Sequence, residues 1–200
     1  MPRYYHSPSI FVDNLIEEKM GQYYKAFNLD KKEIVEPEWL KLMEHSWIND
    51  ESVSSVEMLL IEGGRWFKDR IVWGGDYGDM ELWDVVYNEE GKSRKTWTKL
   101  NNLIEVIPEK YRYIVNFDKE EYIDKKDATE NVHPMPLLLA DGNGRGGGDY
   151  YGSDLHLVEI WKGNSIGILN HIPENFTKLE YNFHNNNYTY DKRGFKKVDL

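Results

Sequence analysis

The sequence predicts an α+β fold in which a mainly antiparallel sheet is built from two diverged hairpin-based repeats and covered by one or two helices. Three observations support this prediction. Two hairpin-like segments recur along the chain, a segment between them has helical periodicity, and the 200 residues include 40% hydrophobic residues. A chain of this length buries roughly 70% of its extended surface on folding, so one core suffices without disulfides, and the chain contains no cysteine.

We expect residues 1–200 to form a single compact domain, because the two halves should share one core. The repeat and the composition divide this domain into five parts. These are an N-terminal extension (1–19), a first repeat half (20–75), a connector (76–110), a second repeat half (111–173) and a C-terminal aromatic and basic segment (174–200).

The hairpin-like segments are YYKAFNLDKKEIV (23–35) and YRYIVNFDKEEYI (111–123). Tyr, Asn, Asp, Lys and Glu coincide at a constant offset of 88 residues. In each segment a β-favouring run meets a polar cluster and is followed by a second β-favouring run, which is the pattern of a β-hairpin. Two such hairpins imply antiparallel pairing.

Two further pairs of blocks follow in the same order. WLKLME (39–44) is similar to PLLLAD (136–141) at an offset of 97, and RWFKDRIVW (65–73) is similar to IWKGNSIGI (160–168) at an offset of 95. Because the order of the three blocks is preserved, we predict an internal duplication. Residues 70–73 and 165–169 are the expected third strands of the two halves.

The segment DESVSSVEMLLIEGG (50–64) has the period of an amphipathic helix. Asp50 is a suitable N-cap, and Gly63 or Gly64 is expected to end the helix. The apolar face of the helix should pack on the sheet, and it contains Val53, Val56, Leu59 and Leu60. The second half is too rich in glycine after residue 141 for an equal helix there.

Four blocks resemble those of a family of small uncharacterised bacterial and phage proteins: MGQYYKAFNLDKKE, KLMEHSW, RWFKDRIVWGGDY and DGNGRGGGDYYG. The resemblance covers roughly residues 20–170. It implies no activity, so no catalytic residue follows from it. It implies that such chains begin at the equivalent of Met20-Gly21, which makes residues 1–19 an extension that could add a helix.

The charge is acidic throughout, with 35 Asp and Glu against 25 Lys and Arg and a formal net charge of -10. A negative field repels phosphate backbones, so direct nucleic-acid binding is not expected. The absence of cysteine excludes Cys-ligated zinc, iron–sulfur clusters and thiol catalysis. No apolar run resembles a signal peptide or a membrane span, and we expect a cytoplasmic protein that makes no membrane contact. The oligomeric state is left open.

The glycine-rich stretch DGNGRGGGD (141–149) could direct backbone N–H groups at an anion, with Arg145 as a clamp. A Rossmann site is not expected in antiparallel surroundings, and no P-loop lysine follows. The alternative is a purely structural turn. The predicted ligand-binding residues are Asp141, Asn143, Arg145, Gly146, Gly147, Asp149, Tyr150 and Tyr151.

Two weaker motifs favour structural interpretations. The sequence GNSIG (163–167) matches GxSxG, but β-favouring residues follow Ser165 instead of the helix of a nucleophile elbow. His156 could join Asp149 and Asp154 at a divalent metal, but the six histidines are scattered without metal-ligand spacing. We therefore predict no metal site and no cofactor.

These observations favour a non-enzymatic binding protein that holds an anionic small ligand or a protein partner with the glycine-rich loop and nearby aromatic residues. The resemblance to phage proteins suggests an inhibitor or counter-defence protein. Such a protein could block a basic nucleic-acid-binding enzyme with an acidic surface, for which we predict Asp76, Asp79, Glu81 and Asp84.

The alternative function is an enzyme that acts on a nucleotide or another phosphorylated small molecule. Arg145 and the loop amides would then bind the phosphate. Metal ligands or acid–base groups would come from Asp141, Asp149, Asp154 or His156. The sequence therefore leaves open whether the protein is an enzyme, but it favours a binding protein without enzymatic activity.

Overall fold

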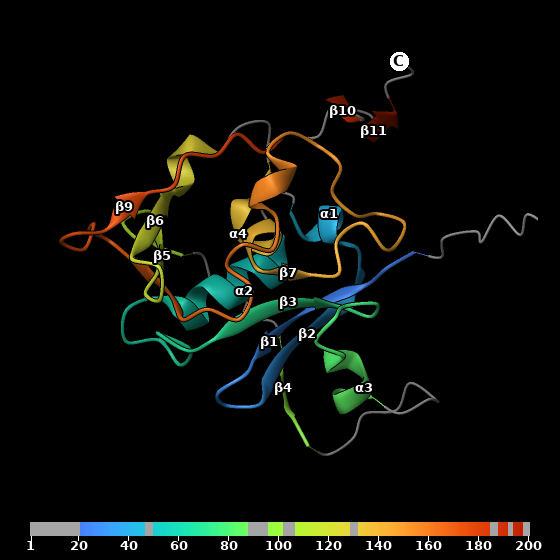
Figure 1. Ribbon diagram of the computed structural model, residues 1–200, viewed down its shortest axis with the longest axis horizontal. Coiled ribbons are helices and arrows are strands. Elements are labelled where there is room, and N and C mark those ends of the chain that lie inside the picture. The colour runs from blue at the N-terminus through green and yellow to red at the C-terminus, as the bar shows by residue number, and fades with distance from the viewer. Residues whose placement is uncertain are drawn as a thin grey trace, which may run out of the picture.

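The computed structural model describes residues 21–46, 50–87, 96–101, 107–128, 132–184, 188–191 and 194–197. It shows an α+β fold with a five-stranded sheet, a four-stranded sheet and a two-stranded hairpin near the C-terminus (Figure 1). The predicted fold class is confirmed. The helix considered for residues 1–19 lies outside the described residues.

The strands are β1 (Tyr24–Asn28), β2 (Glu33–Leu40), β3 (Ile71–Gly75), β4 (Thr98–Leu100), β5 (Tyr113–Asn116), β6 (Glu121–Asp124), β7 (Ala140–Asp141), β8 (Ile166–Leu169), β9 (Thr177–Lys178), β10 (Tyr188–Asp191) and β11 (Gly194–Lys197). The α-helices are α1 (Leu42–His45), α2 (Glu51–Leu60), α3 (Leu82–Val86) and α4 (Pro134–Leu138), and the 3-10 helices are η1 (Lys125–Asp127) and η2 (Leu155–Leu157).

Both large sheets have the same arrangement at their centre. The five-stranded sheet has the order β4-β2-β1-β3-β7, and the four-stranded sheet has the order β8-β5-β6-β9. The triplets β2-β1-β3 and β6-β5-β8 are antiparallel, whereas β4, β7 and β9 run parallel to their neighbours. The expectation of a mainly antiparallel sheet is therefore only partly correct. The parallel strands are short pieces of long connections, which local hairpin patterns do not predict.

The two predicted hairpins are present and have the same turn. In the β1–β2 hairpin, the side-chain oxygen of Asn28 accepts hydrogen bonds from the amides of Asp30 and Lys31 at 3.0 and 2.9 Å. Asn116 accepts the equivalent pair of amides in the β5–β6 hairpin at 3.0 and 3.1 Å. The polar cluster thus folds the turn locally, as Asx turns do.

The edge strands β4 and β9 also join their sheets in the same way. The amide of Thr98 donates to the carbonyl of Lys32 at 2.9 Å, and the amide of Thr177 donates to the carbonyl of Glu120 at 2.8 Å. Lys32 and Glu120 are both left-handed, with φ of 52° and 53°. This edge pairing is a further likeness between the halves.

The predicted helix α2 begins as expected, because the side chain of Asp50 accepts a hydrogen bond from the amide of Val53 at 2.9 Å. It ends at Leu60, before the glycines, since Ile61 leaves the helix and pairs with Ile168 of β8. The predicted apolar face is buried. Figure 1 shows α3 on the opposite side of the five-stranded sheet from α2, so helices cover both faces of that sheet.

The helix ends identify the true counterpart of α2. The carbonyl of Leu59 accepts a hydrogen bond from the amide of Trp66 at 2.7 Å, and the carbonyl of Leu138 accepts one from the amide of Trp161 at 2.9 Å. The short helix α4 therefore takes the place of the end of α2. Leu59 and Leu138 lie 79 residues apart.

At this offset PLLLAD (136–141) matches EMLLIE (57–62), and its expected match with residues 39–44 is wrong. Both candidate segments are rich in leucine, so composition alone does not separate them. Only the hydrogen bonds at the helix ends distinguish them.

The halves contact each other through reciprocal hydrogen bonds. The amide of Ile71 donates to the carbonyl of Asn164 at 3.0 Å, and the amide of Ile166 donates to the carbonyl of Asp69 at 3.0 Å. Each bond becomes the other when the halves are interchanged. This is the pattern of two units related by an approximate two-fold rotation.

The segments that follow the two helices are exchanged between the halves. Ala140, after α4, pairs with Trp73 of the first half, and Ile61, after α2, pairs with Ile168 of the second half. One buried core contains residues from both halves. The shared strand order, turns and exchanged segments support the proposed duplication.

Each half has one long segment without a counterpart. The offset rises from 79 at Leu138 to 95 at Trp161, so the second half is 16 residues longer there. A second difference lies between the third strand of each half and its edge strand. The third strands, β3 and β8, start 95 residues apart, whereas the edge strands, β4 and β9, start 79 residues apart. The first half is therefore 16 residues longer after β3. We name these parts the glycine-rich segment (141–157) and the α3 segment (76–87).

Buried tryptophans are bound to glutamates in the same way in both halves. The indole N–H of Trp66 donates to Glu33 at 2.7 Å, and that of Trp161 donates to Glu121 at 2.8 Å. Both tryptophans are fully buried. Each pair ties the connection before the third strand to the start of the second strand.

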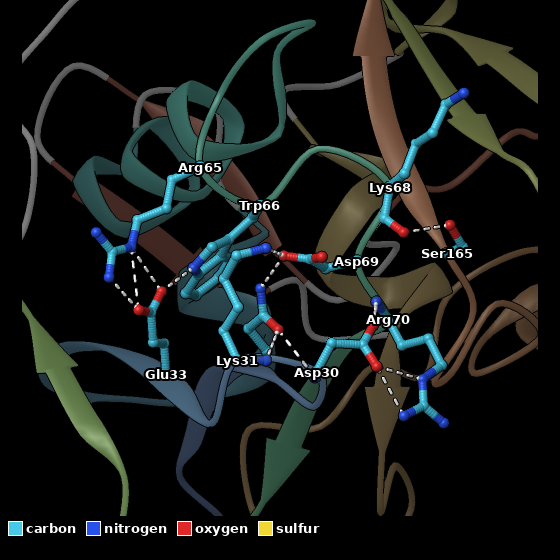
Figure 2. Close-up of polar contacts among 10 residues, drawn as sticks. Asp30, Lys31, Glu33, Arg65, Trp66, Lys68, Asp69, Arg70 and Ser165 are labelled. Atoms are coloured by element: carbon cyan, nitrogen blue, oxygen red, sulfur yellow. Dashed lines mark hydrogen bonds and ion pairs between the residues drawn. The ribbon is translucent and has the colours of Figure 1, made fainter.

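Among the described residues, only the first of these glutamates has an arginine beside it. Arg65 donates to both carboxylate oxygens of Glu33 (Figure 2), and the equivalent position of the second half is Ile160. The Arg65 guanidinium, together with the Trp66 indole, holds the pKa of Glu33 below its usual value, although burial acts in the opposite direction.

We expect Glu33→Gln to lower the free energy of unfolding at pH 7 by roughly 1.5–3 kcal/mol, because it removes charge-assisted hydrogen bonds. Since the folded state lowers the pKa of Glu33, the ionised group stabilises the fold above pH 4.5, and this contribution is lost as the pH falls through the folded-state pKa. The difference in the free energy of unfolding between wild type and Glu33→Gln should therefore decrease below pH 4.5. Urea unfolding over a pH series measures it.

Glu121→Gln is the matched control. Glu121 also accepts a hydrogen bond from a buried tryptophan, but the position equivalent to Arg65 is Ile160. Its stability deficit should change less with pH. A Glu33→Gln deficit that stays constant from pH 7 to well below pH 4.5 would show that Arg65 does not stabilise the carboxylate.

Candidate functional site

The glycine-rich segment and the α3 segment are joined by a buried carboxylate. Asp141, which is 1% exposed, accepts hydrogen bonds from the amides of Asp79 and Met80 at 3.2 and 2.9 Å. The ammonium of Lys162 donates to the same carboxylate at 2.9 Å. Asp141 therefore has a structural role in joining the two segments.

A second buried carboxylate organises the middle of the glycine-rich segment. Asp149, which is 4% exposed, accepts hydrogen bonds from the amides of Arg145 and Gly146 at 2.8 and 2.9 Å. The hydroxyl of Tyr24 donates to it at 3.1 Å. The amides that the sequence suggested for an anion thus bind a carboxylate of the chain itself.

Glu159 plays the same part at the start of the segment. Its carboxylate accepts hydrogen bonds from the amides of Gly142 and Asn143 at 2.8 and 2.7 Å, and it lies 3.4 Å from the ammonium of Lys162. Sequence reasoning missed Glu159. No local pattern indicates it, because the contact depends on the return of the whole segment to residue 159.

Arg145 points to the α3 segment. Its guanidinium donates to the carbonyl of Tyr77 at 3.0 Å and forms an ion pair with Asp79 at 2.5 Å. The pair lowers the pKa of Asp79, chiefly through the Arg145 hydrogen bond. Arg145 therefore joins the two segments, as Asp141 does.

The remaining predicted ligand residues divide into core and surface. Asn143 binds both the amide and the carbonyl of Tyr150, at 2.8 and 3.1 Å, and the Tyr150 ring is fully buried. The carbonyl of Gly147 accepts a hydrogen bond from the amide of Gln22 at 3.1 Å. Tyr151, in contrast, is 55% exposed.

Gly146 is required by a close approach. A Cβ atom at this position would lie 2.3 Å from the Cβ of Gln22, so any larger residue would force the backbone apart. The glycine-rich composition is therefore partly explained by packing against the residues before β1.

The four predicted partner-binding acids are not equivalent. Asp76 is half-buried and accepts a hydrogen bond from the amide of Tyr23 at 3.1 Å, and burial raises its pKa. Asp79, Glu81 and Asp84 are exposed, with Asp79 paired to arginine as described above. Three of the four acids thus lie on the surface of the α3 segment.

A cavity of about 250 Å³ opens beside the glycine-rich segment. It lies where the segment leaves β7 and where it returns after η2. Its lining combines apolar side chains with one carboxylate, and the residues are Asn143, Gly144, Tyr151, Leu155, Val158 and Glu159.

Exposed hydrophobic side chains gather on the same two segments. Among the described residues, six large hydrophobic side chains are exposed, and five of them belong to the α3 and glycine-rich segments. These five are Tyr77, Met80, Val85, Tyr151 and Leu155. The sixth, Ile172, lies after β8, outside both segments.

The candidate metal ligands do not converge. Asp154 accepts a hydrogen bond from the amide of Asn182 at 2.7 Å, while Asp149 is engaged by Tyr24 and the loop amides. Within the part of the chain that the structure describes, no three His, Asp or Glu side chains are grouped as a metal site would require.

Ser165 lies directly before β8 and forms an antiparallel bridge with Arg70 of the first half (Figure 2). Its hydroxyl donates to the carbonyl of Lys68 at 2.6 Å, and its amide donates to Asp118 at 2.9 Å. The amide of Arg70 donates to Asp30 at 2.7 Å in the same way. This arrangement agrees with the structural interpretation of the GxSxG motif.

Comparison of the chain with protein-family models, curated proteins and solved structures finds no match. Among the described residues, no helix is both long and apolar enough to cross a bilayer. The function must therefore be argued from the geometry of the two joined segments.

Proposed function

We propose that the protein is a non-enzymatic binding protein that engages a protein partner through the glycine-rich segment and the α3 segment. The observation that carries this proposal is the concentration of five of the six exposed large hydrophobic side chains of the described residues on these segments. Apolar groups gathered among polar ones mark interaction surfaces, and tyrosine is a frequent anchor of such surfaces.

The place of the two segments in the fold supports this proposal. Both lie where one half is 16 residues longer than the other, so the shared architecture of the halves does not require them. They are nevertheless held together by the buried Asp141 and by the Arg145–Asp79 ion pair. A surface that the shared architecture does not require, but that buried polar contacts hold in place, is suited to binding.

Charge indicates the kind of partner. Asp79, Glu81 and Asp84 are exposed on the α3 segment, and the whole chain carries a net charge of -10. Such a field steers association with basic surfaces. A nucleic-acid-binding enzyme has a basic surface of this kind, and a protein bound there would act as an inhibitor.

The alternative, an enzyme for phosphorylated molecules, has less support. The amides of residues 142, 143, 145 and 146 donate to Glu159 and Asp149, and Arg145 is paired with Asp79. The cavity of about 250 Å³ is also smaller than the roughly 300–1,000 Å³ typical of small-molecule sites.

Met80→Asp tests the proposal, since it places a charge in the exposed apolar group. We expect roughly 10- to 100-fold weaker partner binding, the effect of losing an interface anchor. Ile172→Asp is the matched control, because Ile172 is also a large exposed hydrophobic side chain but lies after β8, outside both segments. Native mass spectrometry of the tagged protein from cells that normally contain it measures complex formation.

Wild type and Ile172→Asp should carry the same protein partner, and Met80→Asp should be a bare monomer. A bare wild-type monomer would overturn the proposal. So would a complex that Met80→Asp retains as well as Ile172→Asp does.

A further inference from the structure

We propose that the cavity beside Tyr151 receives an arginine side chain of the protein partner. This inference rests on the proposed function and specifies the chemistry of its anchor. The cavity lies in the glycine-rich segment and is lined by two of the exposed hydrophobic side chains, Tyr151 and Leu155. An anchor seated here would thus contact two side chains of the proposed binding surface.

The size of the cavity selects a single side chain. Its volume of about 250 Å³ lies below the range of roughly 300–1,000 Å³ typical of drug-sized ligands. Interfaces commonly place one long or aromatic side chain of the partner in such a hollow, with surrounding contacts that exclude water.

The charges around the cavity select a cation. Among the described residues that line the cavity, Glu159 is the one acid, and none is a lysine or an arginine. Lys162 lies behind it, 3.4 Å from Glu159 and 2.9 Å from the buried Asp141. Arg145 also interacts electrostatically with both carboxylates and is paired with Asp79. Three carboxylates therefore face two cations, and the local charge remains negative. One oxygen of Glu159 accepts both loop amides, whereas among the described residues the other oxygen is contacted by Lys162 at 3.4 Å.

The aromatic wall favours arginine over lysine. A guanidinium stacks on an aromatic face and binds a carboxylate through a planar fork, which a lysine ammonium does not. Tyr151 is 55% exposed, so its ring is accessible for such stacking, and Leu155 and Val158 offer apolar surface for the methylene groups of the side chain.

The test is a titration of the ¹⁵N-labelled full chain with blocked single amino acids, followed by NMR. The probes are N-acetyl-arginine methylamide, its lysine counterpart and its citrulline counterpart, which keeps the shape of arginine without the charge. We expect the arginine probe to shift the amide signals of the cavity lining, at Gly144, Tyr151 and Glu159. The citrulline probe should leave them unchanged.

Two variants assign the effect to the cavity. Tyr151→Ala should weaken binding of the arginine probe roughly 3- to 10-fold through loss of stacking. Glu159→Gln keeps an acceptor for the loop amides but removes the charge, and it should abolish the preference for arginine over citrulline. Tyr77→Ala, which changes an exposed tyrosine outside the cavity lining, should bind the probe as wild type does.

Equal binding of citrulline, tighter binding of lysine, or shifts away from the cavity would overturn this inference. Native mass spectrometry separates its failure from that of the proposed function. A complex that Met80→Asp abolishes but Tyr151→Ala and Glu159→Gln retain would keep the binding surface and reject the arginine anchor. Absence of any complex with the wild type would reject the binding function itself.

Discussion

Trp161→Ala is expected to lower the free energy of unfolding by about 3–5 kcal/mol, the cost of truncating a large aromatic side chain in a packed core. Trp161 is fully buried and belongs to the core that both halves share. Its indole also donates to Glu121, which would lose this partner. Urea unfolding followed by far-UV circular dichroism measures the change.

Trp161→Phe and Tyr151→Ala are the controls for this measurement. The phenylalanine variant keeps most of the apolar volume and loses the hydrogen bond to Glu121, so it should cost less than the alanine variant. Tyr151→Ala removes an exposed ring and should change stability by less than about 1 kcal/mol. A loss below 1 kcal/mol for Trp161→Ala would contradict the described core.

Asp149→Ala should lower the free energy of unfolding by roughly 2–4 kcal/mol, because it leaves several buried donors without an acceptor. These donors are the amides of Arg145 and Gly146 and the hydroxyl of Tyr24. Burial, with the charge of Asp149 as a further cause, raises the pKa of Tyr24, so its hydroxyl remains a neutral donor.

Hydrogen exchange locates this effect. The amides of Arg145 and Gly146 should exchange faster in Asp149→Ala by a larger factor than amides of β1. Asp84→Ala, which removes an exposed carboxylate, should change neither stability nor exchange of these amides. If the two amides kept their protection in Asp149→Ala, the carboxylate would not be what orders the glycine-rich segment.

The local parts of the fold could be predicted from the sequence. The Asn-centred turns at Asn28 and Asn116 need only neighbouring amides, and the helix start at Asp50 needs only the first turn. Patterns within a few residues carry this information. The two hairpins and α2 were therefore found.

Contacts between distant segments were not predictable. The parallel strands β4, β7 and β9 and the match of α4 to the end of α2 depend on which segments meet in space. At the candidate site, the glycine-rich stretch was found by composition. The acceptors of its amides were not, since Glu159 lies 16 residues or more from the amides it binds.

Exposure of the binding surface was likewise hidden in the sequence. Met80 and Leu155 are apolar like core residues, and only the fold shows that they are exposed while Tyr150 is buried. The acidic residues of the α3 segment were noticed by their charge, but the half-burial of Asp76 depends on its bond to Tyr23.

The exchange of Ile61 and Ala140 between the halves has a consequence for aggregation. Each residue covers the outer strand of the other half, β8 or β3, at the point where that strand would otherwise offer free backbone groups. Unpaired strand edges recruit strands of other molecules. If one half unfolded alone, it would expose a strand edge on the half that stayed folded. The exchange therefore makes a partly unfolded molecule prone to aggregation, which favours cooperative unfolding of both halves.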